Sequence, residues 1–167
     1  GSGRFFLTFK FAYDNLGVGP LIVRGGRADV GSPMLASQVV RNADGSSDVL
    51  PGAGLLTYLP DPGYQRWGYG IQGYELRSLD DVVVGAGPAL GLCLIDSVNT
   101  PVVTLPGEPA RAVYKSCGSG VPDLLNLDFG VSVGWRNEHG ANFAGQMIDI
   151  TSLAAGEYVL VHRSEER

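Results

Sequence analysis

Arg136, Glu138 and His139 stand close together in the sequence and combine a cation, a carboxylate and an imidazole. Such a group can carry out general acid–base catalysis. The competing interpretation is a solvated loop that follows a strand, because loops collect polar side chains. We favour the loop and keep the three residues as a candidate polar cluster.

Other residues capable of chemistry have simpler explanations. His162 alternates with Leu160 and Tyr158, which is typical of one face of a strand near the end of the chain. Asp80 and Asp81 could hold a cation, but paired acids are ordinary residues of a hairpin turn. A carboxylate pair could come from three further acids, whose separation in space the sequence does not define: Asp96, Asp128 and Asp149.

Cys93 and Cys117 are the two cysteines of the chain. Their spacing is compatible with a disulfide or with two free thiols. It does not match the closely spaced pairs of a zinc site. If Cys117 were free, the nearby Lys115 would lower its thiol pKa.

The elements that must position these residues are short strands. Residues 4–13 alternate strictly, which predicts one strand with a buried face formed by Phe5, Leu7, Phe9, Phe11 and Tyr13. Asp44-Gly45 predicts a hairpin turn. Residues 124–127 could form a single helical turn. Further strands are expected at 21–24, 34–40, 49–50, 55–59, 74–77, 82–84, 90–95, 102–105, 112–114, 131–135, 146–150 and 157–162, which indicates an all-β antiparallel sandwich.

Length and composition agree with one folded domain. The chain has 167 residues, 44% of them hydrophobic and 17% charged, with 25 glycines and 10 prolines. A net charge of −5 without a basic stripe argues against nucleic-acid binding. No apolar run reaches the roughly 20 residues that span a bilayer. We expect a cloning remnant at 1–3, a single domain at 4–163 and a solvated tail at 164–167.

Four sequence blocks follow one another in a fixed order along the chain. They are Asn15-x-Gly17-x-Gly19-Pro20-Leu21 with Arg24-Gly25; Gln38 with Asp44-Gly45; Tyr74-Glu75-Leu76-Arg77 with Leu92-Cys93-Leu94-Ile95-Asp96; and Tyr114 to Cys117 with Gly130 to Trp135 and Gly145 to Tyr158. In this order the blocks resemble the lysyl-oxidase-like domain of bacteria. Their glycines and proline set turns, which a fold requires with or without chemistry, so the resemblance indicates the fold more than the activity.

The chemistry implied by the resemblance requires copper held by three histidines and a quinone made from a lysine and a tyrosine. Residues 60–77 correspond to the copper segment and contain no histidine, since Arg66 and Gly68 flank Trp67. Arginine does not deprotonate to become a ligand, and glycine has no side chain. The two quinone positions correspond to Ala89 and Glu138. We therefore expect no cofactor and no bound metal.

The same resemblance implies a disulfide, because Cys93 and Cys117 stand where the family forms one. Disulfides persist outside the reducing cytoplasm, so we expect an extracellular or cell-surface protein.

The degenerate copper segment carries large amphipathic side chains: Tyr64, Arg66, Trp67 and Tyr69. These residue types dominate binding energy at interfaces, which makes the four a candidate binding surface. The alternative is that the rings turn inward and fill the space of the lost metal, and we favour it slightly because buried aromatics are more common.

Our functional prediction is a non-catalytic binding or assembly module on a lysyl-oxidase-like scaffold, with a protein partner or self-assembly. The alternatives are a divergent copper amine oxidase acting on peptidyl lysine and an enzyme with an unrecognised site.

Overall fold

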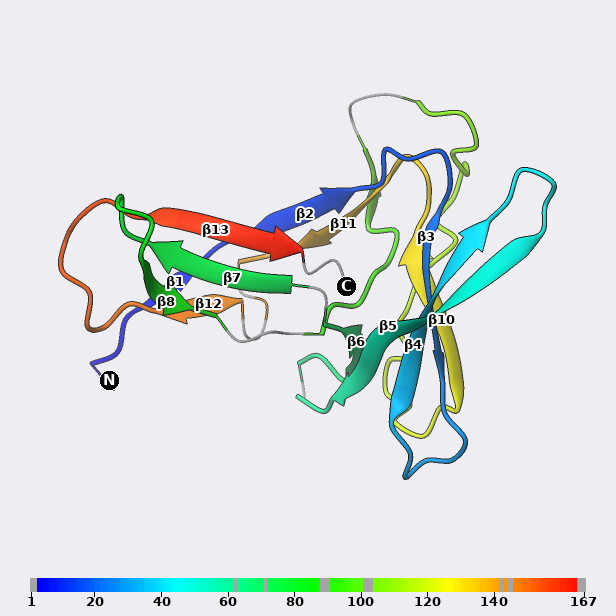
Figure 1. The fold of residues 1–167 in the computed structure, drawn as a ribbon, viewed down its shortest axis with the longest axis horizontal. Coiled ribbons are helices and arrows are strands. Elements are labelled where there is room, and N and C mark those ends of the chain that lie inside the picture. Colours follow the sequence, from blue (N-terminus) through cyan, green and yellow to red (C-terminus); the bar gives the residue numbers. More distant parts are fainter. Residues whose placement is uncertain are drawn as a thin grey trace. The chain divides into compact units, whose positions relative to one another are not determined.

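A computed structural model describes residues 3–61, 63–70, 72–87, 91–100, 104–141, 143 and 146–164. These residues form antiparallel strands and no helix, so none of them builds an apolar helix able to cross a bilayer (Figure 1). The all-β antiparallel class expected from the sequence is confirmed. The strands are β1 (Phe6–Thr8), β2 (Phe11–Asp14), β3 (Leu21–Gly26), β4 (Met34–Arg41), β5 (Ser47–Leu59), β6 (Arg66–Tyr69), β7 (Gln72–Arg77), β8 (Val83–Ala86), β9 (Val98–Asn99), β10 (Asn126–Val131), β11 (Trp135–His139), β12 (Met147–Asp149) and β13 (Val159–Ser164).

The chain divides into two compact units, each made of segments that are distant in sequence. Unit 1 consists of Gly1–Phe11, Ile71–Leu90 and His139–Arg167, and unit 2 consists of Ala12–Gly70 and Gly91–Glu138. One domain over residues 4–163 stays a prediction. Residues 1–2 and 165–167 of the predicted termini lie outside the described residues, whereas Ser164, expected in the tail, is the last residue of β13.

Unit 1 contains a three-stranded sheet, in the order β13-β7-β8, and the two-stranded sheet β1-β12. Along β7 the side chains of Tyr74 and Leu76 are buried, as period-two alternation requires, and with Ile148 of β12 they form the core. Gly85 of β8 permits this packing, because a Cβ there would lie 2.9 Å from Cγ2 of Ile148.

The single strand expected over residues 4–13 is interrupted. Its alternation is correct for Leu7, Phe9 and Phe11, which pack against the core of unit 1, and wrong for Phe5, which is expected on the buried face and is 67% exposed. The strand breaks because its two halves pair with different partners: β1 pairs with β12, whereas β2 joins the sheet β2-β11-β9. At the break, the carbonyl of Phe9 accepts a hydrogen bond from the side-chain amide of Gln146.

Unit 2 contains a five-stranded sheet in the order β10-β3-β4-β5-β6. It also contains the sheet β2-β11-β9, except for the terminal residues Phe11 of β2 and His139 of β11, which are assigned to unit 1. The Asp44-Gly45 hairpin is confirmed: Gly45 has a φ of +85°, and Asn42 donates its N–H to the carbonyl of Ser46. The five-stranded sheet buries aliphatic residues from several strands, among them Val23, Met34 and Leu56.

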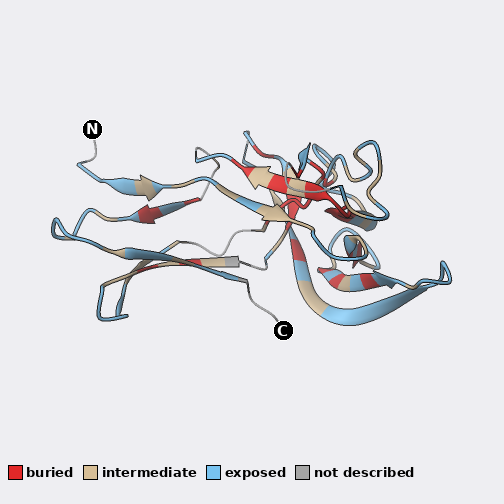
Figure 2. Ribbon diagram, turned by 90° about the horizontal axis from the view of Figure 1, so that it is seen from above, coloured by how far each residue is buried: buried red, intermediate tan, exposed pale blue. Residues whose placement is uncertain are grey.

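β5 is one long strand where the sequence predicts two short ones. Ala36 pairs with Gly54 and the next residue, Ser37, pairs with Pro51, so the extra residues of β5 form a bulge. Gly52 and Gly54 have φ values of +81° and +130°, which favour glycine. The first part of β5, Ser47–Gly52, is exposed (Figure 2).

Several further expectations are wrong. Residues 124–127 do not form a helical turn, because β10 begins at Asn126 and pairs with β3. The strand expected over residues 131–135 is interrupted by a turn at 132–134 between β10 and β11, where Gly134 has a φ of +72°. The residues around Trp67 that are expected in a loop include a strand, β6.

Three expected strands do not form in the part of the chain that the structure describes. Residues 91–95 contain only an isolated bridge from Leu92 to Tyr69, and residues 104–105 and 112–114 form no strand. Leu90 and residues 102–103 lie outside the described residues.

Candidate functional site

Residues 63–70, part of the segment that the resemblance assigns to copper, lie in unit 2 and include the edge strand β6. Asp61 begins the preceding turn, since its carbonyl accepts the N–H groups of Tyr64 and Gln65 and its carboxylate accepts that of Gly63. β6 then pairs with β5, placing Trp67 opposite Tyr58. Its other edge is covered as well, because Trp67 donates its N–H to the carbonyl of Cys117.

Trp67 and Tyr64 belong to the interior of unit 2. Trp67 is 4% exposed, and its Nε1 donates to the carbonyl of Val121 at 3.0 Å. Tyr64 is 7% exposed, and its hydroxyl accepts the N–H of Cys93 at 3.1 Å. Burial raises the pKa of the Tyr64 phenol. The inward alternative therefore holds for these two rings, and the candidate binding surface is wrong for them.

The other two members of that candidate surface are partly exposed but engaged with unit 2. The guanidinium of Arg66 lies 5.3 Å from the centroid of the Tyr64 ring. The Tyr69 hydroxyl donates to the carbonyl of Ala53, and the Tyr69 N–H donates to the carbonyl of Leu92. Arg66 also lines a shallow hollow together with Gln65 and Gly120. The four residues do not form one continuous contact surface.

A disulfide joins Cys93 and Cys117, with their Cα atoms 5.6 Å apart. This is the pairing implied by the resemblance. Both cysteines are buried. Cys93 directly follows Leu92, whose backbone bonds to Tyr69 of β6, and the carbonyl of Cys117 accepts the N–H of Trp67 of β6. The disulfide therefore fixes the cover over the second edge of β6. It also removes the possible effect of Lys115 on a free thiol.

This segment does not fit a copper ion. A Cβ on Gly68 would lie 2.3 Å from the carbonyl oxygen of Gly91, so a histidine cannot be placed at this position without moving the backbone. Arg66 supplies no ligand. No group of three or more potential metal ligands occurs among the residues described. The quinone position Ala89 lies outside the described residues, and Glu138 is on β11.

The candidate polar cluster is split by the strand that carries it. Residues 135–139 form β11 instead of the expected loop, and their burial alternates, with Trp135, Asn137 and His139 buried. Arg136 and Glu138 therefore occupy the opposite face from His139. Arg136 forms a bidentate ion pair with Asp14, with N···O distances of 2.6 and 2.9 Å, which lowers the pKa of Asp14. The three residues do not form an acid–base group.

Both histidines contribute to aromatic packing in unit 1. The ring centroids of His139 and Phe11 are 4.7 Å apart, and those of His162 and Tyr74 are 4.9 Å apart, both pairs stacked. His162 lies on β13, as its alternation predicts. Burial lowers the pKa of His162 and raises that of Tyr74, which favours the neutral form of both side chains.

The three separate acids form no carboxylate pair. Asp96 accepts the N–H groups of Val113, Tyr114 and Ser132, which makes it a structural anchor in unit 2. Asp128 pairs with Arg24 on the five-stranded sheet. Asp149 belongs to unit 1 and pairs with Arg4. Each acid therefore has a local structural partner.

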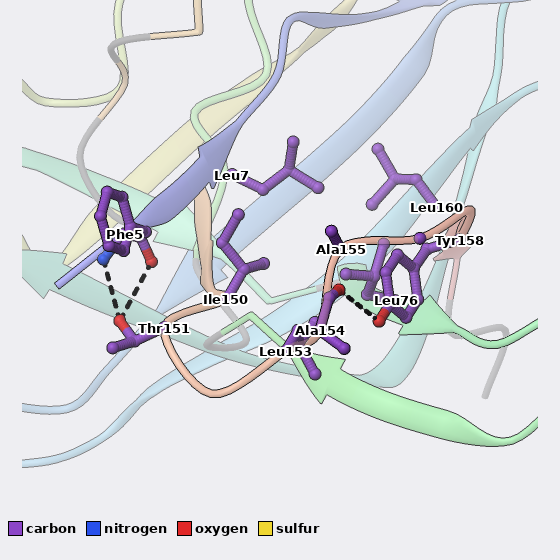
Figure 3. A pocket seen from close by; sticks show the side chains of 11 residues that line it. Phe5, Leu7, Leu76, Ile150, Thr151, Leu153, Ala154, Ala155, Tyr158 and Leu160 are labelled. Carbon is purple, nitrogen blue, oxygen red and sulfur yellow. Dashed lines mark hydrogen bonds between the residues drawn. The ribbon is translucent and has the colours of Figure 1, made fainter.

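The clearest concave site lies in unit 1 and is not anticipated from the sequence. It is a cavity of about 730 Å³ between β1, β7, β13 and the loop that follows β12 (Figure 3). Most of its lining is aliphatic. The residues are Phe5, Leu7, Leu76, Ile150, Thr151, Leu153, Ala154, Ala155, Gly156, Tyr158 and Leu160.

The polar groups of this cavity are already bonded to its own wall. Tyr158 donates its hydroxyl to the carbonyl of Ala154 at 2.9 Å. The Thr151 hydroxyl accepts the N–H of Phe5 at 2.9 Å. None of the described lining residues is an acid, a base, a histidine or a cysteine. The cavity is suited to binding an apolar group rather than to proton transfer.

Comparison with protein-family models, with curated proteins and with solved structures finds no match to this chain.

Proposed function

We propose that this protein is a non-catalytic, extracytoplasmic binding module on a lysyl-oxidase-like scaffold. The observation that carries the proposal is the apolar cavity of unit 1, whose polar atoms are engaged within its wall. Its volume falls within the range of about 300–1,000 Å³ that is typical of ligand sites. An open apolar surface of this kind provides affinity when a ligand covers it, without supplying a nucleophile or a general base.

The degenerate copper segment supports the non-catalytic part of the proposal. The position of Gly68 has no room for a ligand side chain, and Trp67 serves the interior of unit 2. The buried disulfide supports the extracytoplasmic part, since such bonds are rare in reducing compartments. Self-assembly or a protein partner remains part of the proposal, because an exposed apolar site is a common contact surface.

The test is the binding of an apolar fluorescent dye, N-phenyl-1-naphthylamine, to wild type and to Ala155→Trp. Ala155 lines the cavity and is exposed, so an indole can enter the cavity without displacing a buried side chain. Ala43→Trp makes the same change in the exposed hairpin turn of unit 2 and is the control. We expect saturable binding that Ala155→Trp abolishes and Ala43→Trp preserves. Absent binding, or equal binding by both variants, would refute the cavity as the functional site.

A further inference from the structure

We infer that the cavity of unit 1 binds the aliphatic chain of a small amphiphile with an uncharged head group. This inference rests on the proposed function and specifies its ligand. The lining comes from several segments, with Phe5, Leu7 and Ile150 toward one side of the view and Leu160, Tyr158 and Leu76 toward the other (Figure 3). Apart from the hydroxyls of Thr151 and Tyr158, which bond within the wall, the lining side chains are hydrocarbon and favour a hydrocarbon chain over a polar ligand.

The cavity continues the core of unit 1. Leu76 is 4% exposed and belongs to the core, whereas Phe5 is 67% and Leu160 is 39% exposed. Leu7, Ile150, Leu153 and Tyr158 pack partly against the core and partly line the cavity. The cavity therefore has exposed residues, Phe5 and Leu160, at its border and a buried one, Leu76, at its base, so a hydrocarbon chain that enters it leaves water and is stabilised by the hydrophobic effect.

The wall of the cavity is held in place before a ligand binds. Hydrogen bonds fix the loop after β12 at its start, where the Phe5 N–H donates to the Thr151 hydroxyl, and at its end, where the Tyr158 hydroxyl donates to the carbonyl of Ala154. Between these bonds the loop presents small residues, Ala154 to Gly156, which leave space instead of filling it. A pre-formed wall lowers the entropic cost of binding.

The absence of charge from the cavity favours an uncharged head group. None of its described lining residues is charged. The charged neighbours in sequence of Phe5 and Ile150, Arg4 and Asp149, pair with each other, with Arg4 Nε 3.0 Å from the Asp149 carboxylate. Glu75 and Arg77 pair at 2.6 Å and lie on the opposite face of β7 from Leu76, because side chains alternate along a strand. The lining therefore offers no cation to an anionic head group. A polar head group within the cavity would lose its hydrogen bonds to water.

The experiment is displacement of bound N-phenyl-1-naphthylamine by 1-decanol, by decanoate and by a soluble apolar peptide. We expect displacement by 1-decanol, with decanoate weaker by about tenfold or more. Methyl shifts in NMR spectra should then be confined to cavity residues such as Leu7, Ile150 and Leu160. Leu160→Ser changes an exposed rim residue and should weaken 1-decanol binding while the circular dichroism spectrum stays unchanged.

The outcomes separate this inference from the proposed function. If the dye binds in the cavity but 1-decanol does not displace it, the inference is wrong and the binding function stands. Displacement by the peptide alone would also refute the inference, because it assigns the cavity to a protein partner. Stronger displacement by decanoate than by 1-decanol would refute the uncharged head group. If the dye itself does not bind in the cavity, the proposed function fails first.

Discussion

Residues 63–70 of unit 2 and the cavity of unit 1 place large apolar side chains in opposite surroundings. In unit 2, Tyr64 and Trp67 fold inward, and the second edge of β6 is covered by backbone next to the disulfide. In unit 1, Phe5, Leu160 and their neighbours border an open apolar cavity. The aromatic residues that suggest a binding surface in the sequence are packed inside unit 2, whereas the apolar residues that suggest none border an open cavity in unit 1. A binding site is thus defined by what tertiary packing leaves uncovered.

The largest expected effect concerns the closed segment. Trp67→Ala should cost about 3–5 kcal/mol of the free energy of unfolding, because it removes a buried ring and leaves a cavity. Chemical denaturation measures the change. The control is Leu35→Ala on β4, whose side chain is 62% exposed and which should be nearly neutral. A stable Trp67→Ala variant would mean that this ring is not part of the interior.

The disulfide should contribute almost as much. The double variant Cys93→Ser/Cys117→Ser opens a loop with a sequence separation of 24. Chain-entropy arguments give a loss of about 3–4 kcal/mol for a loop of this length. Denaturation with and without a reductant should show the same loss in wild type, and none in the double variant. Titration of two free thiols in the unreduced, unfolded protein would contradict the bond.

A smaller effect is expected at the open site. Tyr158→Phe removes the hydroxyl bond to Ala154 and should cost about 0.5–1.5 kcal/mol. Because this bond holds the cavity wall, the variant should also bind N-phenyl-1-naphthylamine more weakly. Tyr58→Phe, in unit 2, makes the same chemical change and should leave dye binding unchanged. Equal dye binding by Tyr158→Phe and wild type would show that the wall does not depend on this bond.

The smallest expected effect is a pH dependence of the stability that Asp149 contributes at the start of the cavity loop. Hydrogen bonds from Thr151 and then from Arg4 lower the pKa of Asp149 from 3.8 to about 2. A lowered pKa stabilises the fold above the ordinary value, and this stabilisation is lost as the pH falls toward 2. Asp149→Asn should therefore be slightly less stable than wild type at pH 7. Denaturation at several pH values should show the difference shrinking below pH 3.8. A difference that is constant with pH would contradict the ion pair.

The strands that alternation and turn chemistry define could be predicted from the sequence. The Asp44-Gly45 hairpin is an example, and so is the alternation from Leu7 to Phe11. These signals are local, because side-chain period and positive φ are set by neighbouring residues. The disulfide followed from the family resemblance and not from the spacing of the cysteines.

The remaining features depend on contacts between distant segments. The glycines in and around β6 favour a loop in the sequence. In the structure these residues form a strand because they pair with β5 and bond to Leu92 and Cys117. The cavity combines Phe5, Leu76 and the loop after β12, which no sequence pattern brings together. The hydrogen bond from Tyr158 to Ala154 joins residues close in sequence, but it defines only a turn and not the cavity beside that turn.

The most direct test of the central claim is a copper and amine-oxidase measurement on the purified protein. The protein is incubated with copper(II), and hydrogen peroxide release from an alkyl amine is followed together with the visible absorption spectrum. We predict background peroxide release and no quinone band, because Gly68 and Arg66 provide no copper ligands and Glu138 stands where the resemblance would require a tyrosine. Stoichiometric copper binding accompanied by a quinone band and amine turnover would contradict the account of this protein as a non-catalytic binding module.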